Sequence, residues 1–127
     1  MKLWLARIAS QAPDLHPRAT LEEAWDLVAS ACGVSETDFT RRVAEHFHLA
    51  LADLSAIPRS VLELIPEKIV RQFQVVVTRI DKQRITVATA DPTNLRAEQA
   101  IAFASGKKVV FEIAAPSQLR AFIADHS

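Results

Sequence analysis

The 127-residue sequence has few of the residue types on which small catalytic and metal sites depend. It contains one cysteine, Cys32, and two glycines, Gly33 and Gly106. A single cysteine excludes a disulfide within the chain and a zinc site built from several thiolates. We expect Cys32 to be a small buried hydrophobic residue, because free cysteine is among the most buried residue types.

Glycine is also too scarce for a nucleotide-binding loop. The Walker A sequence G-x-x-x-x-G-K-[ST] depends on glycines whose backbone amides cradle the phosphates. Gly106 is followed by Lys107, but no glycine precedes it at the required spacing, and it comes after an expected helix instead of before one. The sequence therefore predicts no nucleotide hydrolysis by this chain.

Two further absences narrow the class of protein. The 15 Lys and Arg residues balance the 15 Asp and Glu residues, so DNA or RNA binding, which favours a basic surplus, is not expected. The start MKLWLAR is too soon interrupted by charge for a signal peptide, and no apolar run approaches the roughly 20 residues that span a bilayer. We therefore expect a soluble, cytoplasmic protein without direct membrane insertion.

The sequence that is present centres on the stretch from Phe73 to Leu95, FQVVVTRIDKQRITVATADPTNL. Two runs rich in β-branched residues, 75–77 and 85–90, flank a short polar link. β-Branched residues suit a pleated, half-buried surface, so the pattern predicts an antiparallel hairpin. The link lacks Asn-Gly or Asp-Gly, which leaves the turn type open.

A helix is expected directly after the hairpin. Pro92 cannot extend a strand but fits the first turn of a helix, with Asp91 as the N-cap. The helix should run over 93–105, and Gly106 stands where a left-handed C-terminal cap is favoured. Asp91 is therefore interpreted as a helix cap and not as a catalytic acid.

The remaining patterns predict helices before the hairpin, then a strand and a helix after it. We expect a short helix at 3–12, paired helices from Thr20 to Cys32 and from Ser35 to Phe47, short helices at 58–64 and 66–71, a strand at 108–113 and a last helix at 116–124. This is an α+β layout: an N-terminal helical lobe followed by a small three-stranded sheet, an antiparallel hairpin plus one strand, covered by helices on one face.

The expected organisation has three parts. Residues 1–19 form an N-terminal helix and a proline-containing linker, 20–56 a helical hairpin lobe, and 57–127 a sheet lobe, with 20–127 as one compact domain. No catalytic or metal-binding set is recognisable; His46 and His48, for example, are two apart, which places them on different faces of a helix. We therefore expect no catalytic residue, no metal and no cofactor.

Several segments resemble a known family. ITVATADPTN at 85–94, followed by a helix and FASGKKV at 103–109, is similar to the N-terminal domain of the type II secretion and type IV pilus assembly ATPases, the secretion ATPase E family. FHLALADL at 47–54 and SVLELIP at 60–66 resemble further segments of that domain. The resemblance covers roughly residues 20–125, and it implies a regulatory or docking domain that acts in cis on an ATPase domain located later in the family's proteins.

The resemblance also implies a partner. In the type II branch such domains bind the cytoplasmic domain of an inner-membrane protein, the L protein, and so hold the ATPase peripherally at the inner membrane. Helix-mediated docking depends on a few apolar anchors. The predicted anchors are Leu3, Trp4, Leu5 and Ile8. The alternative is that these side chains pack on their own domain.

A second hypothesis is cyclic di-GMP binding, which part of the family achieves with tandem motifs that begin Arg-Leu-Gly. Here Glu23-Ala24-Trp25 stands at that place, and Cys32 and His46 replace the later glycine and glutamine. Loss of the arginine removes a bidentate phosphate contact. The candidate phosphate contacts that remain are Arg18, Arg41 and Arg42. A third hypothesis is the same domain in a stand-alone signalling protein.

Overall fold

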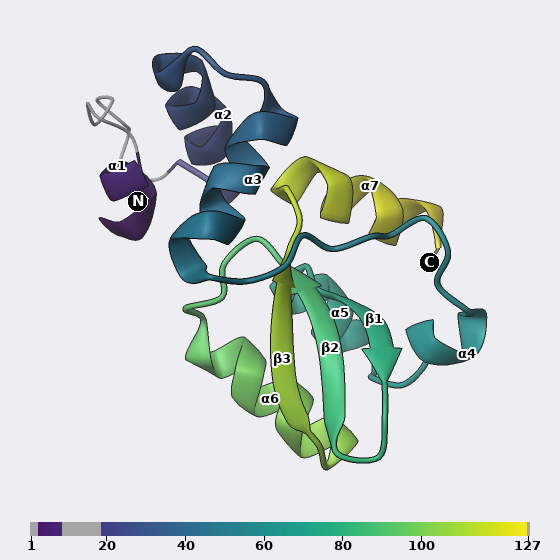
Figure 1. The fold of residues 1–127 in the computed structure, drawn as a ribbon. Coiled ribbons are helices and arrows are strands. Elements are labelled where there is room, and N and C mark those ends of the chain that lie inside the picture. Colours follow the sequence, from purple (N-terminus) through teal and green to yellow (C-terminus); the bar gives the residue numbers. More distant parts are fainter. Residues whose placement is uncertain (1–2, 9–18, 127) are drawn as a thin grey trace.

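The computed structural model describes residues 3–8 and 19–126 (Figure 1). The helices are α1 (Leu3–Ile8), α2 (Leu21–Cys32), α3 (Glu36–Phe47), α4 (Arg59–Leu62), α5 (Glu67–Phe73), α6 (Leu95–Ser105) and α7 (Pro116–Asp125). The strands are β1 (Val76–Ile80), β2 (Arg84–Thr89) and β3 (Lys108–Ile113). The predicted α+β class is confirmed. The predicted first helix is observed over Leu3–Ile8, and the rest of it lies outside the described residues.

The helical lobe has the caps that the sequence predicts. Thr20 Oγ1 accepts a hydrogen bond from the Glu23 N–H at 3.1 Å and begins α2, and Ser35 begins α3 in the same way. Gly33 ends α2 with φ of 69°, in the left-handed region that glycine adopts without a Cβ clash. Polar capping and one glycine therefore separate the two helices of the hairpin.

The sheet has the strand order β1-β2-β3, with β1 antiparallel to β2 and β2 parallel to β3. The β1–β2 turn needs no glycine because Asp81 organises it. Its carboxylate accepts hydrogen bonds from the N–H groups of Gln83 and Arg84, each at 2.8 Å. The side chain of an Asx residue thus replaces the backbone geometry that Asn-Gly would supply.

The predicted N-cap of the helix after β2 is wrong by three residues. Asn94, not Asp91, caps α6, and its Oδ1 accepts from the Ala97 N–H at 3.2 Å. The Asp91 carboxylate instead accepts from the Thr93 N–H at 3.0 Å and forms a turn before the helix. Two capping residues stand close together here, and the side chain of the later one bonds the helix.

Helices lie on both faces of the sheet, whereas the sequence predicts one covered face. Val77, Val87 and Phe111 of the strands share a buried cluster with Ile101 of α6 and with half-buried side chains of α5. On the opposite face, Val76 and Ala88 belong to the same buried cluster as α7. The short side chain of Ala88 leaves room for a helix there, which the β-branched pattern alone does not indicate.

The helical lobe and the sheet share a core. One buried cluster includes Trp25 and Phe39 from the helical hairpin together with Ile113 from β3. The segment after α3 also joins the sheet, since the Ile113 N–H donates to the Ala50 carbonyl at 2.9 Å. An ion pair between Arg120 of α7 and Glu22 of α2 adds a contact at the surface.

Replacement of Ile101 by alanine should lower the free energy of unfolding by about 2 to 5 kcal/mol, because this fully buried side chain fills the space between α6 and the sheet. Phe103→Ala on the same helix is the matched control. Phe103 is 93% exposed, so a change within about 0.5 kcal/mol is expected. Urea unfolding of both variants checks the pair, and equal losses would contradict this orientation of α6.

Candidate functional site

The first candidate surface is the place where α1 lies on the helical hairpin. Leu5 is fully buried and Trp4 is 9% exposed. The Trp4 ring contacts Trp25 of α2 and Phe47 of α3 edge-on, with centroids 6.1 and 5.0 Å apart. Aromatic pairs at these distances and angles are attractive. In this structure α1 therefore packs on its own domain.

The described contacts between α1 and the rest of the domain are apolar. No hydrogen bond or ion pair joins residues 3–8 to any other residue that the structure describes. The indole N–H groups of Trp4 and Trp25 are both buried without a hydrogen-bond partner in the described part of the chain. A buried donor without an acceptor costs roughly 1 to 3 kcal/mol. Burial of these N–H groups therefore opposes the packing of α1 on the lobe.

The predicted anchors are placed unequally by this packing. Ile8 is half-buried and lies against the same cluster as Trp4 and Leu5, while the side chain of Leu3 is outside the described atoms. As long as α1 remains on the lobe, Trp4, Leu5 and Ile8 face the lobe's own core. Their role as anchors for a partner stays a prediction.

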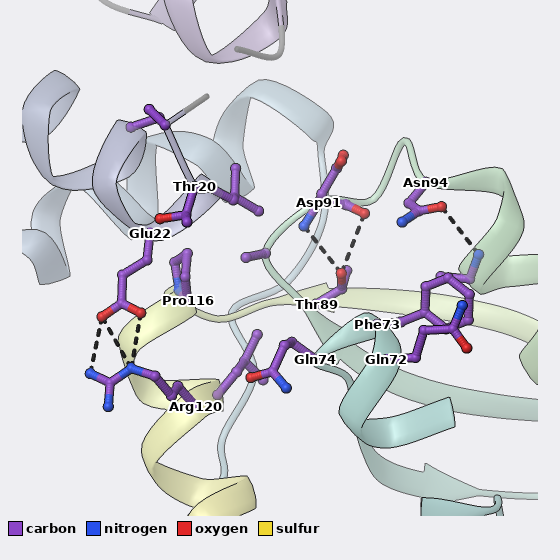
Figure 2. A pocket seen from close by; sticks show the side chains of 16 residues that line it. Thr20, Glu22, Gln72, Phe73, Gln74, Thr89, Asp91, Asn94, Pro116 and Arg120 are labelled. Atoms are coloured by element: carbon purple, nitrogen blue, oxygen red, sulfur yellow. Dashed lines mark hydrogen bonds and ion pairs between the residues drawn. The ribbon is translucent and has the colours of Figure 1, made fainter. Parts of the chain in front are cut away.

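The second candidate is a cavity of about 610 Å³ between the helical lobe and the sheet. Its wall is made by the first turns of α2, α6 and α7, the end of α5 and the loop after β2. Figure 2 shows the Glu22–Arg120 ion pair on one side and Asp91 on the other. A volume of this size lies within the range of small-molecule sites.

The electrostatics of this cavity do not favour a polyanion. Arg120 is the cation among the described residues that line it, and it binds Glu22 through two nitrogens, at 2.9 and 3.0 Å. The hydrogen bond from Arg120 lowers the pKa of Glu22, so the carboxylate stays ionised beside the guanidinium. Two of the three helix N-termini in the wall, those of α2 and α6, are also capped by the side chains of Thr20 and Asn94. Phosphate oxygens would compete with these partners and face Asp91.

Two of the three arginines proposed for phosphate contact, Arg41 and Arg42, lie away from the cavity. Arg41 and Arg42 are exposed on α3, and neither lines it. Arg41 forms an ion pair with Asp38 at 3.2 Å. Arg18 lies outside the described residues.

The described residues also hold no metal cluster and no membrane span. No group of three or more His, Cys, Asp or Glu side chains among them could hold a metal ion. His46 is exposed, with its ring edge-on to Phe47. None of the described helices is long and apolar enough to cross a bilayer. Cys32 is half-buried against the core, which agrees in part with the prediction.

The sheet lobe and the segment that leads into it match a known domain family. The MshEN domain model matches residues 47–127. This chain belongs to the MshEN domain family. The resemblance to secretion ATPase N-terminal domains is thereby confirmed, while α1 and α2 lie outside the matched residues. No curated protein matches the sequence.

Solved structures share the fold of this MshEN domain. MshE with cdg (cyclic di-GMP) is 24% identical, with a TM-score of 0.68 over 82% of this chain and 77% of that one. The N-terminal domain of XpsE is 20% identical, with a TM-score of 0.61 over 98% and 83% of the two chains. The same XpsE domain in a second crystal form is 23% identical, with a TM-score of 0.57 over 77% of this chain and 72% of that one. These likenesses establish the fold and extend it over the helical lobe.

Glu23 and Trp25 lie before the matched residues 47–127, at the place where the sequence analysis expects the start of the cyclic di-GMP motif. Trp25, where the motif has glycine, is fully buried and stacks edge-on against Phe39 at 5.4 Å. A ligand therefore cannot approach the backbone there as it could at glycine. Glu23, where the motif has arginine, is exposed and would repel phosphate.

Sequence reasoning missed one buried charge. The Glu112 carboxylate of β3 is buried, accepts from Thr78 Oγ1 at 3.0 Å and pairs with Arg79 at 3.0 Å. An acidic residue inside the otherwise apolar strand KVVFEI was the available signal. Since both carboxylate oxygens have partners, Glu112 is a structural group.

Acidic side chains crowd the outer side of the helical lobe. Partial burial raises the pKa of Asp26, and the negative charges of Glu36 and Glu22 raise it further. The ionised form of Asp26 is therefore disfavoured in the folded state. The stability that this shift contributes is present below the ordinary value of 3.8 and is lost as pH rises through the higher folded pKa.

Asp26→Asn should therefore stabilise the dilute domain at pH 7, by on the order of 0.5 kcal/mol because solvent screens the group. The asparagine amide would donate to Glu36 where the aspartate repels it. Urea unfolding at pH 7 and pH 3 tests this, with Asp125→Asn at the end of α7 as control. A loss of stability at pH 7, or an equal gain at both pH values, would contradict the interpretation.

Proposed function

We propose that this MshEN domain is a non-catalytic docking domain of a type II secretion or type IV pilus ATPase. It binds the cytoplasmic domain of an inner-membrane partner, the L protein or its pilus equivalent, and so keeps the ATPase at the cytoplasmic face of the membrane. The observation that carries the proposal is that α1 packs on the lobe through aromatic contacts, while neither buried indole N–H has an acceptor among the residues that the structure describes.

Release of α1 is the proposed docking step. On leaving the lobe, Trp4 loses its contacts with Trp25 and Phe47, but both indole N–H groups gain water or a partner as acceptor. The partner then covers the apolar side chains of α1 and offsets the lost burial. A helix of six residues is too short to be stable by itself, so α1 folds only against one of the two surfaces.

Trp4→Ala should weaken binding to the partner's cytoplasmic domain by at least about tenfold, since aromatic anchors typically contribute 2 kcal/mol or more. The matched control is Arg7→Ala, because Arg7 is exposed on the same helix. Calorimetric titration of the purified partner domain measures both affinities. Circular dichroism confirms folding of each variant. Unchanged affinity of a folded Trp4→Ala variant would refute α1 as the docking element.

Cyclic di-GMP binding is the second candidate, and the shared fold with MshE with cdg is the observation that favours it. The exposed guanidinium of Arg42, with Arg41 beside it, is the phosphate contact available on α3. Docking ranks higher because this domain has Glu23 and a buried Trp25 where the motif has arginine and glycine.

Titration with cyclic di-GMP should therefore produce no binding heat, with ATP as the parallel control. Binding with a Kd near 1 μM would correspond to about 8 kcal/mol of specific contacts and would reverse the ranking. In that case Arg41→Ala and Arg42→Ala show whether α3 holds the phosphates. Their failure to weaken the binding would move the site elsewhere in the domain.

A further inference from the structure

Charge is separated between the two lobes although the whole chain is neutral. Residues 1–18 carry three basic and one acidic side chain, residues 19–56 two basic and seven acidic side chains, and residues 57–126 ten basic and seven acidic side chains. The helical lobe therefore has a formal charge of −5 and the sheet lobe +3. In Figure 1, α2 lies at one end of the molecule and the β1–β2 turn at the other.

The basic end gathers around the β1–β2 turn. Lys107 Nζ donates to the Lys82 carbonyl at 2.9 Å, and Arg84 is the register partner of Lys108 across β2 and β3. Four cations therefore share this end of the sheet with one acid, Asp81, whose carboxylate is held by the N–H groups of the turn. Phe103, in the last turn of α6 just before Lys107, exposes 93% of its surface. An aromatic ring is thus presented to solvent beside a cluster of positive charges.

The outer face of α2 has the opposite character. Leu27 is 47% exposed there, and Glu23 lies one turn before it on the same face. Asp26 is adjacent and also exposed, so two carboxylates flank Leu27 on this face of α2. An apolar side chain is therefore framed by carboxylates, as Phe103 is framed by lysines.

We propose that these two surfaces bind each other in neighbouring copies of this chain. The basic end, defined as Lys82, Arg84, Phe103, Lys107 and Lys108, contacts the acidic face, defined as Glu23, Asp26 and Leu27. Phe103 and Leu27 meet at the centre, and the charges around them pair. Both halves of the contact are present in one molecule and match in sign, which favours a second copy over an unrelated partner.

The geometry of this contact makes it head-to-tail. The basic end and the acidic face are different surfaces at opposite ends of the molecule, so one copy cannot bind its own acidic face. Each copy that joins through such a contact leaves one basic end and one acidic face of the assembly unoccupied. It therefore forms a ring or an open chain instead of a closed two-fold dimer.

Sedimentation of the 127-residue chain at low salt tests the proposal. The average mass should rise from the monomer value of 14.0 kDa as the concentration approaches about 1 mM, and about 0.5 M NaCl should suppress the rise by screening. Lys107→Glu with Lys108→Glu reverses the basic end, and Glu23→Lys with Asp26→Lys reverses the acidic face. Each double variant alone should remain a monomer.

An equimolar mixture of the two double variants should associate again, because the reversed basic end of one then matches the reversed acidic face of the other. Phe103→Ala in the wild-type background should weaken association at least about fivefold without unfolding the domain. Circular dichroism checks every variant. A chain that stays monomeric at low salt, or one whose association survives charge reversal of a folded variant, overturns the proposal.

Discussion

The position of Ile113 at the end of β3 is the constraint on which the rest of the domain depends. Its side chain lies in the core of the helical lobe, while its N–H and carbonyl bond Ala50 and Ala52 of the segment after α3. One residue thus belongs to the sheet by its strand and to the helical lobe by its burial. The two lobes therefore share a core instead of meeting at a surface, and the cavity between them has fixed walls.

Local chemistry made much of this fold predictable from the sequence. Two hydroxyl side chains cap helix N-termini as predicted, those of Thr20 and Ser35. The two glycines, Gly33 and Gly106, end helices with positive φ angles. Predictions failed where two local solutions compete or where tertiary packing decides. Asp91 and Asn94 can both cap, and only the backbone path selects Asn94. The second face of the sheet is covered because α7 packs on it. The residue composition of the strands does not predict that position of α7.

The candidate site was less predictable than the fold for the same reason. Apolar residues at helical spacing, such as Trp4 and Leu5, look alike whether they serve a core or a partner. What distinguishes them is the hydrogen bonding around the rings: Trp4 has aromatic neighbours at favourable distances, but no described residue accepts a hydrogen bond from its N–H. The helix α1 is therefore well packed, but its position leaves a buried N–H group without a hydrogen bond to a described residue.

The buried Glu112 has a consequence for how the sheet assembles. The run Val75-Val76-Val77 is apolar on both faces, so hydrophobic burial discriminates weakly between strand alignments. A one-residue slip of β1 would move Thr78 and Arg79 away from Glu112 and leave a carboxylate in the interior without donors. Such a group costs far more than an imperfect valine contact. The hydrogen bonds of Glu112 with Thr78 and Arg79 therefore favour one register of β1 in the sheet.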